Sequence, residues 1–580
     1  MKQIFKYLFV LLAGLTISSC ENYLEPIDDK PVDDQMLSND PTYMEGILLH
    51  AYKSLPNKYN YNSEAATDNA VSNVKTLNYL MIANGAWSSE YTPFNEYNDN
   101  FTEVYYLNKF LSLYENVNWS NDPKLSPADN VAIAEGHKKR LKGEAYGLRA
   151  FYQYQLLQTA GGMGADGQLL GFPIVTSVVS ASDNYKLPRN SFDDCVKQIV
   201  ADCDIALQTL PVKYADIAGN ANYNKAFGVR FLDRLDARGV MAIKAQTLLL
   251  AASPAFNPTN NVAKWEAAAV AAAELIKDAK NVLPATGLKF YALATATTYN
   301  TDVIWANAKT NSNDFEQENY PPSLNGSGNI NPTQNLVDAF PMANGYPINN
   351  AAAKYDATKP YTGRDLRFAE YVIADGQTYI APINTYVGAN KDGLNSLLTS
   401  TRTGYYLKKF MDPIAKYNPA TGTWSQSARS FVHFRYTQMF LNFAEAANEA
   451  WGPKGDPKAY GFNAQSVLQQ IRKRAGIEAT DPYLLTDVAT DQTKFRELVR
   501  NERRLELCFE GSRFWDIRRW NLINTMKTTA KGMSITNNAG IKTYSVIDVE
   551  PRLYSDFMIY PPIPYNEVIK SGLIQNKGWN

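Results

Sequence analysis

The chain has 580 residues, and its charges are almost balanced, with 57 Lys and Arg against 58 Asp and Glu. With 45% hydrophobic residues, 20% charged residues and a mean hydropathy of −0.34, it is typical of a globular protein with a large core and too polar for an integral membrane protein. Because there is no basic surplus, the composition argues against binding to nucleic acid or to anionic lipid headgroups.

The N-terminus has the pattern of a bacterial export signal. Two lysines precede the apolar run 9–15, and small residues follow directly before Cys20. The apolar run is too short to span a bilayer stably. A cysteine after small residues resembles a lipobox, so we expect residues 1–19 to be a lipoprotein signal peptide and Cys20 to be acylated. An ordinary secretory signal with an incidental cysteine is the alternative.

Residues 20–39 are polar and acidic and are interpreted as a tether between the lipid and the globular body. Each buried methylene of an acyl chain contributes roughly 0.8 kcal/mol, so two or three chains would anchor the body firmly. After Cys20 no segment approaches the run of about 20 apolar residues that a membrane-spanning helix needs. We therefore expect a globular protein held at a membrane by lipid alone.

Helical periodicity dominates the body. Apolar residues at helical spacing predict helices over 41–55, 99–117, 127–160, 191–210, 234–252, 262–280, 430–451, 463–475 and 490–510. Several of these segments alternate small and aromatic side chains, as in Ala145, Ala150 and Phe151, which is typical of tetratricopeptide-type (TPR-like) hairpins. The sequence therefore predicts a mostly α fold built on a TPR-like scaffold of helical hairpins, although the repeats do not keep a strict spacing.

The amino-acid composition changes between residues 285 and 430. Gly, Asn, Pro, Thr and Tyr dominate there, with short strand-like runs at 303–305 and 405–407. Long irregular segments inside a compact protein are usually functional. We therefore expect an N-terminal helical region over 40–284 and a C-terminal region over 285–580, whose insertion 285–430 consists of functional loops with a few short strands.

Cysteines and histidines give no indication of a disulfide or a metal site. Cys195 and Cys203 lie eight residues apart in one predicted helix, at about 12 Å, and cannot form a disulfide. Together with Cys508 they are interpreted as small buried apolar residues. The three histidines of the chain do not have metal-ligand spacing. The run 162–167 matches G-x-G-x-x-G but follows a helix instead of a strand, so we expect no nucleotide or other cofactor.

One pair of carboxylates could imitate a glycosidase site. Glu502 and Glu506 lie one helical turn apart, about 6 Å at Cβ. The surrounding segment 500–520 is rich in arginine, however, and carboxylates among guanidinium groups are more often structural ion pairs. We therefore favour structure over catalysis for this pair.

Segment 500–520, with the sequence RNERRLELCFEGSRFWDIRRW, resembles the C-terminal signature of the SusD/RagB family, surface lipoproteins of Bacteroidetes that bind glycans for import. The closing segment 560–579 and the segment 140–175 resemble the same family, as do the lipobox and the helical repeats. The resemblance thus extends over essentially the whole chain.

The resemblance implies a fold, a function and a location. It implies four TPR-like hairpins in a single body, and a loop-rich face that binds oligosaccharide or polysaccharide without catalysis. The implied partner is a SusC-like TonB-dependent transporter of the outer membrane, on whose extracellular side the lipid-anchored protein would sit as a lid. The same scaffold carrying peptide or glycopeptide is the alternative. The glycan itself stays open, with starch, fructan, xylan, mannan and host glycans all compatible.

Sugars present C–H faces that stack on aromatic rings and hydroxyl groups that need hydrogen-bond partners. Two stretches in the N-terminal third and the irregular region suit that role, and the candidate glycan-binding residues are Asp68, Asn69, Trp87, Tyr91, Trp305, Tyr320 and Arg367. Each has a structural alternative: core packing for the two tryptophans, a turn cap for Asp68, a loop anchor for Tyr320, and an ion pair with Asp365 for Arg367.

Overall fold

The computed structural model describes residues 40–93, 96–179, 186–293 and 298–579. The predicted signal peptide 1–19, the acylation site Cys20 and the tether 20–39 lie outside the described residues. Across the described ranges, none of the helices has both the length and the apolar character needed to span a bilayer.

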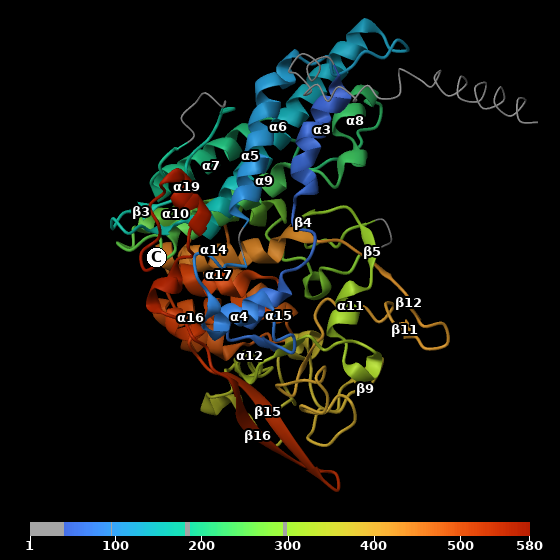
Figure 1. Ribbon diagram of the computed structural model, residues 1–580, viewed down its shortest axis with the longest axis vertical. Coiled ribbons are helices and arrows are strands. Elements are labelled where there is room, and N and C mark those ends of the chain that lie inside the picture. Colours follow the sequence, from blue (N-terminus) through green and yellow to red (C-terminus); the bar gives the residue numbers. More distant parts are fainter. Residues whose placement is uncertain (1–39, 94–95, 180–185, 294–297, 580) are drawn as a thin grey trace, which may run out of the picture.

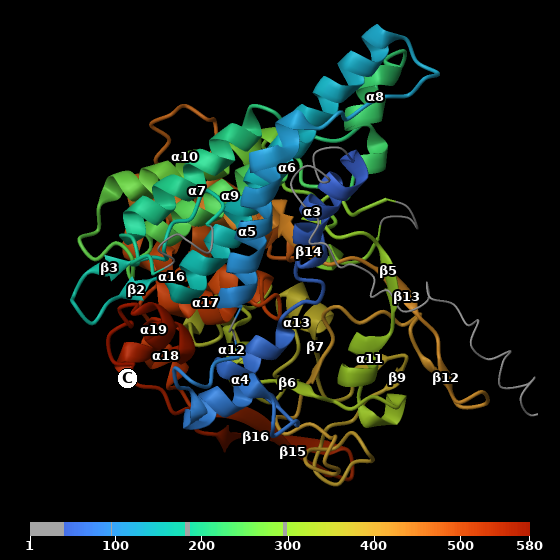
Figure 2. The ribbon, with the colours of Figure 1, turned by 45° about the horizontal axis from the view of Figure 1, so that its top comes forward.

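A series of long helices forms one half of the molecule (Figures 1 and 2). They are α3 (Pro41–Lys53), α5 (Tyr97–Leu113), α6 (Pro127–Ala160), α7 (Phe192–Leu207), α9 (Ala237–Ala252), α10 (Val262–Asp278), α14 (Tyr436–Trp451), α15 (Ala464–Arg474) and α16 (Gln492–Glu506). Each packs on the next: α3 on α5, α5 on α6, α6 on α7, α7 on α9, α9 on α10, α10 on α14, and α14 on both α15 and α16. Serial packing of this kind characterises helical-repeat proteins, and the predicted mostly α, TPR-like scaffold is confirmed.

Local capping signals set the helix ends. The Ser126 and Ser191 side chains accept hydrogen bonds from the backbone N–H groups of Asp129 and Asp194 at the starts of α6 and α7. Gly161 is the C-cap residue of α6, and the helix ends at Ala160, in agreement with the predicted range 127–160. The predicted helix 430–451 begins only at Tyr436, because the preceding residues form a strand instead.

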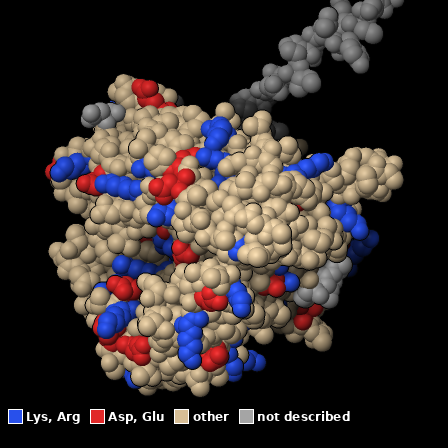
Figure 3. Space-filling model, turned by 90° about the horizontal axis from the view of Figure 1, so that it is seen from below, with Lys and Arg blue, Asp and Glu red and all other residues tan. Residues whose placement is uncertain are grey.

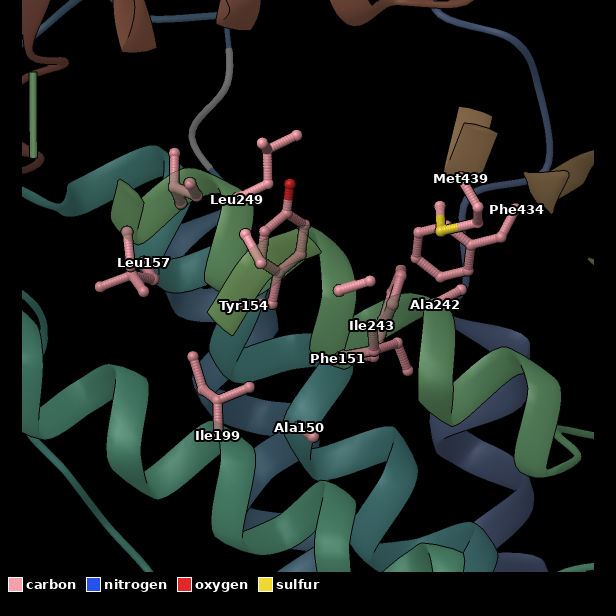
Figure 4. Packing of buried hydrophobic residues seen from close by; sticks show 14 of the residues in the cluster. Ala150, Phe151, Tyr154, Leu157, Ile199, Ala242, Ile243, Leu249, Phe434 and Met439 are labelled. Atoms are coloured by element: carbon pink, nitrogen blue, oxygen red, sulfur yellow. The ribbon is translucent and has the colours of Figure 1, made fainter. Parts of the chain in front are cut away.

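Small and large side chains alternate where the helices meet. Figure 4 shows Ala150 and Phe151 of α6 facing Ile199 of α7 and Ile243 of α9. At Gly147 of α6 an added Cβ atom would lie 2.6 Å from a methyl group of Leu235, just before α9, and 3.0 Å from a methyl group of Val240 in α9. Helices α6 and α9 can therefore approach this closely only because position 147 is small.

Short helices and two-stranded antiparallel ladders complete the described structure, and most of them lie in an irregular half next to the long helices (Figures 1 and 2). The short helices are α4 (Asn78–Met81), α8 (Ala221–Phe227), α11 (Asp314–Asn319), α12 (Gln334–Ala339), α13 (Leu366–Tyr371), α17 (Ser512–Arg519), α18 (Ile523–Met526) and α19 (Tyr565–Ser571). The ladders pair β1 (Ala70–Ser72) with β6 (Ile330–Pro332), β2 (Gly162–Met163) with β3 (Leu169–Leu170), β4 (Val303–Ala306) with β14 (Val432–Arg435), β5 (Thr310–Ser312) with β13 (Ser427–Arg429), β7 (Val372–Ile373) with β10 (Tyr406–Leu407), β8 (Thr378–Tyr379) with β9 (Ala381–Pro382), and β11 (Tyr417–Asn418) with β12 (Thr423–Trp424).

Both strands expected in this region are present, as β4 and β10. The glycine motif at 162–167 begins in β2 and continues into the turn that leads to β3. It therefore does not have the strand-to-helix geometry of a phosphate-binding loop.

A long hairpin of β15 (Ala530–Asn538) and β16 (Ile541–Glu550) projects from the irregular half (Figure 1) and was not predicted. The free edge of β15 is bound by loops, since Met533 N donates to Thr403 O and Val387 N donates to Ile535 O, each at 2.8 Å. The hairpin is therefore attached to the loop region along one edge.

The last residues of the chain return to its N-terminal third. The Arg189 guanidinium donates to the carbonyl of Ile574 at 2.8 Å and to the Asn576 side chain at 3.0 Å. The Trp579 ring packs on Trp87 with centroids 4.9 Å apart. The C-terminal segment is thus joined to the N-terminal third in one core.

The cysteines behave as expected. Cys195, Cys203 and Cys508 are free thiols and buried. Burial raises the pKa of the Cys195 and Cys508 thiols to about 12, so both stay protonated. They act as small apolar residues of the core.

Candidate functional site

Asp68 and Asn69, two of the predicted ligand-binding residues, lie in the core. The Asp68 carboxylate pairs with Arg513 at 3.0 Å and with Arg504 at 2.9 Å. Burial alone would raise its pKa, but the two arginines lower it to about 2. Asn69 donates to Glu64 at 2.7 Å and accepts from Arg504 at 2.7 Å. Both side chains are occupied by buried partners, so they do not face a ligand.

Trp87 is also a core residue, with 4% of its surface exposed. Its ring contacts Trp579 and lies 4.7 Å below the guanidinium of Arg518. Tyr91 is half-buried and donates its hydroxyl to Asn78 at 2.9 Å. Of the first predicted stretch, only Tyr91 therefore reaches the surface.

The second predicted stretch is buried as well. Trp305, 2% exposed, belongs to β4 and packs on His433 at 4.2 Å and on Phe151 at 5.7 Å. Tyr320 is fully buried and donates its hydroxyl to the backbone carbonyl of Asp412 at 2.9 Å. The structural alternatives, core packing for Trp305 and a loop anchor for Tyr320, describe these residues.

Arg367 is the centre of a buried ion-pair network. Its guanidinium contacts Asp365 at 2.6 Å, Glu502 at 2.8 Å and Glu506 at 3.2 Å. The pairing with Asp365 that the sequence offered as the alternative is present, but in the core and not on the surface. A guanidinium that is fully buried and enclosed by three carboxylates is not accessible to a sugar.

Glu502 and Glu506 are structural carboxylates. Glu502 also pairs with Arg472, and Glu506 with Arg435 and Arg474. Burial alone would raise the pKa of each carboxyl, but the surrounding arginines lower it below the ordinary value. Carboxylates that are fully buried and ionised at neutral pH do not supply the proton that glycoside hydrolysis requires. The preference for structural ion pairs over a glycosidase pair agrees with this geometry.

A second network follows in the same segment. Arg519 binds Glu445 with two bonds of 2.6 and 2.7 Å and Asp516 at 2.8 Å. Arg503 also binds Asp516, and the Trp520 indole donates to Glu445 at 2.7 Å. The Arg-rich segment 500–520 therefore joins α14, α16 and α17 from inside.

These networks predict a loss of stability in acid. Burial alone would raise the pKa of Glu445, but the Arg519 guanidinium lowers it from 4.5 to about 2. The folded pKa lies below the unfolded one, so the stabilisation is complete above about pH 4.5 and is lost as the pH falls toward 2. At 1.36 kcal/mol per pKa unit, this carboxyl contributes about 3 kcal/mol at neutral pH. Urea unfolding at pH 7 and at pH 3.5 measures this loss as a difference in the free energy of unfolding. The difference should be smaller in Glu445→Gln. Equal stability of the wild type at both pH values would contradict the prediction.

The irregular half contains a cavity of about 880 Å³, the size of a small-molecule or oligosaccharide site. Its walls come from segments far apart in the sequence: 57–61, 289–293, β5, α11, 408–414 and β13 with the residues that follow it. In Figure 1 two of these elements, β5 and α11, lie on the right-hand side of the molecule, next to the β11–β12 hairpin.

Aromatic rings form much of the cavity wall. They are Tyr59, Tyr61, Tyr291, Phe315, Tyr379, Phe410 and Phe431. Tyr59 stacks on Phe410 with centroids 4.1 Å apart and planes 9° from parallel, and Tyr291 meets the same Phe410 edge to face at 5.1 Å. The half-buried rings of Tyr59, Tyr291 and Phe431 provide apolar faces beside polar groups, which is the design that a sugar-binding site needs.

Phe410 is held in a strained backbone conformation, with φ at +72°. The neighbouring Lys409 is fully buried, and its ammonium donates to the carbonyls of Glu506 at 2.8 Å and Cys508 at 3.0 Å and to the Glu510 carboxylate at 2.7 Å. The ammonium thus fixes the backbone next to Phe410. Through Lys409 the Arg-rich segment is connected to the ring that forms the inner wall of the cavity.

The cavity lies in the region that the sequence favoured, the irregular insertion together with an N-terminal loop, but its lining residues were not predicted. The signal is a repeated mixture of rings and charged groups, as in 57–61 and 408–414. Such mixtures are common in loops, so only the fold shows that these segments meet.

Comparison with known proteins gives matches along most of the chain. The family model described as "SusD family" matches residues 293–579, and the one described as "Starch-binding associating with outer membrane" matches residues 22–228. The SusD-like protein P38 of Formosa agariphila is 23% identical over 545 residues, which cover 88% of this chain and 90% of that protein.

Solved structures share the fold. A SusD-like protein of Bacteroides fragilis is 22% identical and superposes with a TM-score of 0.71 over 94% of this chain and 98% of its own. A SusD-like carbohydrate-binding protein of Bacteroides fragilis is 18% identical with a TM-score of 0.65, over 92% of this chain and 98% of that one. With two family models that together match residues 22–228 and 293–579, the chain belongs to the SusD/RagB family.

Proposed function

We propose that this protein is a cell-surface receptor that binds oligosaccharide or polysaccharide in the ring-lined cavity and passes it to a SusC-like TonB-dependent transporter. It would be held on the extracellular face of the outer membrane by acylated Cys20, and it would leave the glycan chemically unchanged. The observation that carries the proposal is the cavity of about 880 Å³ walled by aromatic rings in a SusD/RagB fold.

The geometry supports binding by non-covalent contact. Rings such as Tyr291 and Phe431 would stack on the C–H faces of sugars, while the hydroxyl, amide and charged groups of the walls would bind sugar hydroxyls. The conspicuous carboxylate pair, Glu502 and Glu506, is buried in ion pairs away from the cavity lining. The family description "Starch-binding associating with outer membrane" supports both the ligand class and the location.

Calorimetry against a panel of polysaccharides tests the proposal. Wild-type protein should bind at least one glycan class and release no new reducing ends. Each ring contact contributes about 0.5–1.5 kcal/mol by analogy with ring pairs, so the double variant Tyr291→Ala, Phe431→Ala should bind roughly 5- to 100-fold more weakly.

The matched control is Tyr105→Ala, which removes a ring that is 45% exposed on α5, outside the cavity lining. It should leave the affinity unchanged. If the double variant binds as tightly as the wild type, the cavity is not the site. If the protein binds none of the glycans but binds peptides or glycopeptides, the ligand of this scaffold is a peptide or glycopeptide.

A further inference from the structure

The charged groups around the cavity are paired within the protein. Lys58 faces Asp314 at 3.2 Å, and Lys289 faces Glu370 at 3.2 Å. These four residues lie on the cavity wall. Both cations therefore already have a carboxylate partner before any ligand arrives.

The remaining cations of the lining are also engaged. Arg429 binds the buried carboxylate of Glu316 at 2.9 Å. The ammonium of the half-buried Lys408 donates to the backbone carbonyl of Ala369 at 2.6 Å. Within the described part of the lining, each cation thus has a protein acceptor.

Two further carboxylates of the lining, Glu318 and Asp412, have no cation as an ion-pair or hydrogen-bond partner among the residues that the structure describes. Glu318 accepts a hydrogen bond from the Tyr61 hydroxyl. Asp412 accepts from the Ser427 hydroxyl and from the backbone N–H of Ile414. Such hydrogen bonds leave the negative charge in place, so the balance at the cavity wall is neutral to acidic.

The cavity wall therefore provides no positive electrostatic potential that would attract a negatively charged sugar. The carboxylate or sulfate of such a sugar would have to displace a protein carboxylate from Lys58, Lys289 or Arg429, or a backbone carbonyl from Lys408. It would do so beside Glu318 and Asp412. On the face of the molecule shown in Figure 3, acidic and basic groups lie side by side. The formal net charge of the chain is −1.

We infer that the cavity selects an uncharged glycan, built of hexoses or pentoses without carboxylate or sulfate groups. This inference rests on the proposed function and narrows its ligand class. The polar walls then act on sugar hydroxyls, for which carboxylates are strong acceptors and lysines are donors. Glu318 contributes acceptor oxygens toward such hydroxyls and repels anionic substituents.

The test compares one sugar backbone in two charge states. A neutral, hexose-containing glycan that the protein binds is oxidised at the primary hydroxyls of its hexoses to carboxylates, and a portion is reduced back to the neutral form. We expect the oxidised form to bind at least tenfold more weakly and the reduced form to recover the original affinity. Affinity for the neutral form should change less than threefold between 50 and 500 mM NaCl, because no ion pair forms.

Glu318→Gln provides the matched variant, since it removes one negative charge and keeps the size of the side chain. In this variant the ratio of the affinity for the neutral glycan to the affinity for the oxidised glycan should be severalfold smaller than in the wild type. Equal or tighter binding of the oxidised form would overturn the inference and leave the proposed function intact. The same conclusion would follow if an acidic polysaccharide bound most tightly, with an affinity that falls more than tenfold over the salt range. Failure to bind any glycan, neutral or acidic, would instead overturn both.

Discussion

Glu506→Gln is expected to lower the free energy of unfolding by about 3–5 kcal/mol, because it removes the negative charge shared by three buried arginines. The Glu506 carboxylate binds Arg474 at 2.7 Å, Arg435 at 3.1 Å and Arg367 at 3.2 Å. Glutamine has nearly the same shape, but its amide replaces an acceptor by a donor that points at a guanidinium. The arginines would then be buried with too little negative charge around them.

Urea unfolding followed by circular dichroism measures this effect, and Glu497→Gln is the matched control. Glu497 lies on the same helix, α16, but its side chain is exposed. The control should change stability by no more than about 0.5 kcal/mol, as surface substitutions usually do. A loss below about 1 kcal/mol in Glu506→Gln would mean that the buried network does not stabilise the fold.

Lys409→Met should weaken glycan binding at least tenfold, although Lys409 is fully buried. Its ammonium holds the backbone next to Phe410, whose positive φ costs about 1–3 kcal/mol and persists only while its surroundings enforce it. Without the ammonium, Phe410 can relax to an extended conformation and move away from its stack with Tyr59. The inner wall of the cavity would then lose its shape.

Calorimetry with the same glycan measures this loss, at a temperature well below the unfolding midpoint of the variant. Lys416→Met removes an exposed lysine of a nearby loop and should leave the affinity within about twofold. Unchanged affinity in a folded Lys409→Met protein would show that Phe410 keeps its place without the ammonium. An affinity loss that simply follows the unfolded fraction would assign Lys409 a role in stability alone.

The helical scaffold could be predicted from the sequence because its signals are local. Side-chain period and capping residues such as Ser126 and Ser191 identify α6 and α7 without knowledge of the rest of the chain. The start of α14 was placed too early, because β14 continues directly into the helix with no turn residue between them. The β15–β16 hairpin was missed, since few of its side chains pack in a core and its pattern of apolar residues is weak.

The site could be predicted only as a region. Trp87 lies in a polar segment whose sequence left both exposure and core packing open, and Trp579, almost 500 positions later, helps to cover it. Trp305 is covered in the same way by His433 from β14. Burial of a single ring is decided by contacts between distant segments, and the local sequence does not contain that information.

The contacts between the C-terminal segment and the N-terminal third have a consequence for biosynthesis. Arg189 finds two of its acceptors only when residues 574 and 576 are present, and the Trp87 ring lies among Phe514, Arg518, Tyr554 and Trp579. A ribosome makes these partners long after Trp87 and Arg189, so the first helices cannot complete their native core until then, in contrast to proteins whose N-terminal domains fold as they emerge. Removal of residues 574–579 would leave Arg189 without two of its acceptors and Trp87 less covered, and quality-control proteases would meet the defect far from the missing segment.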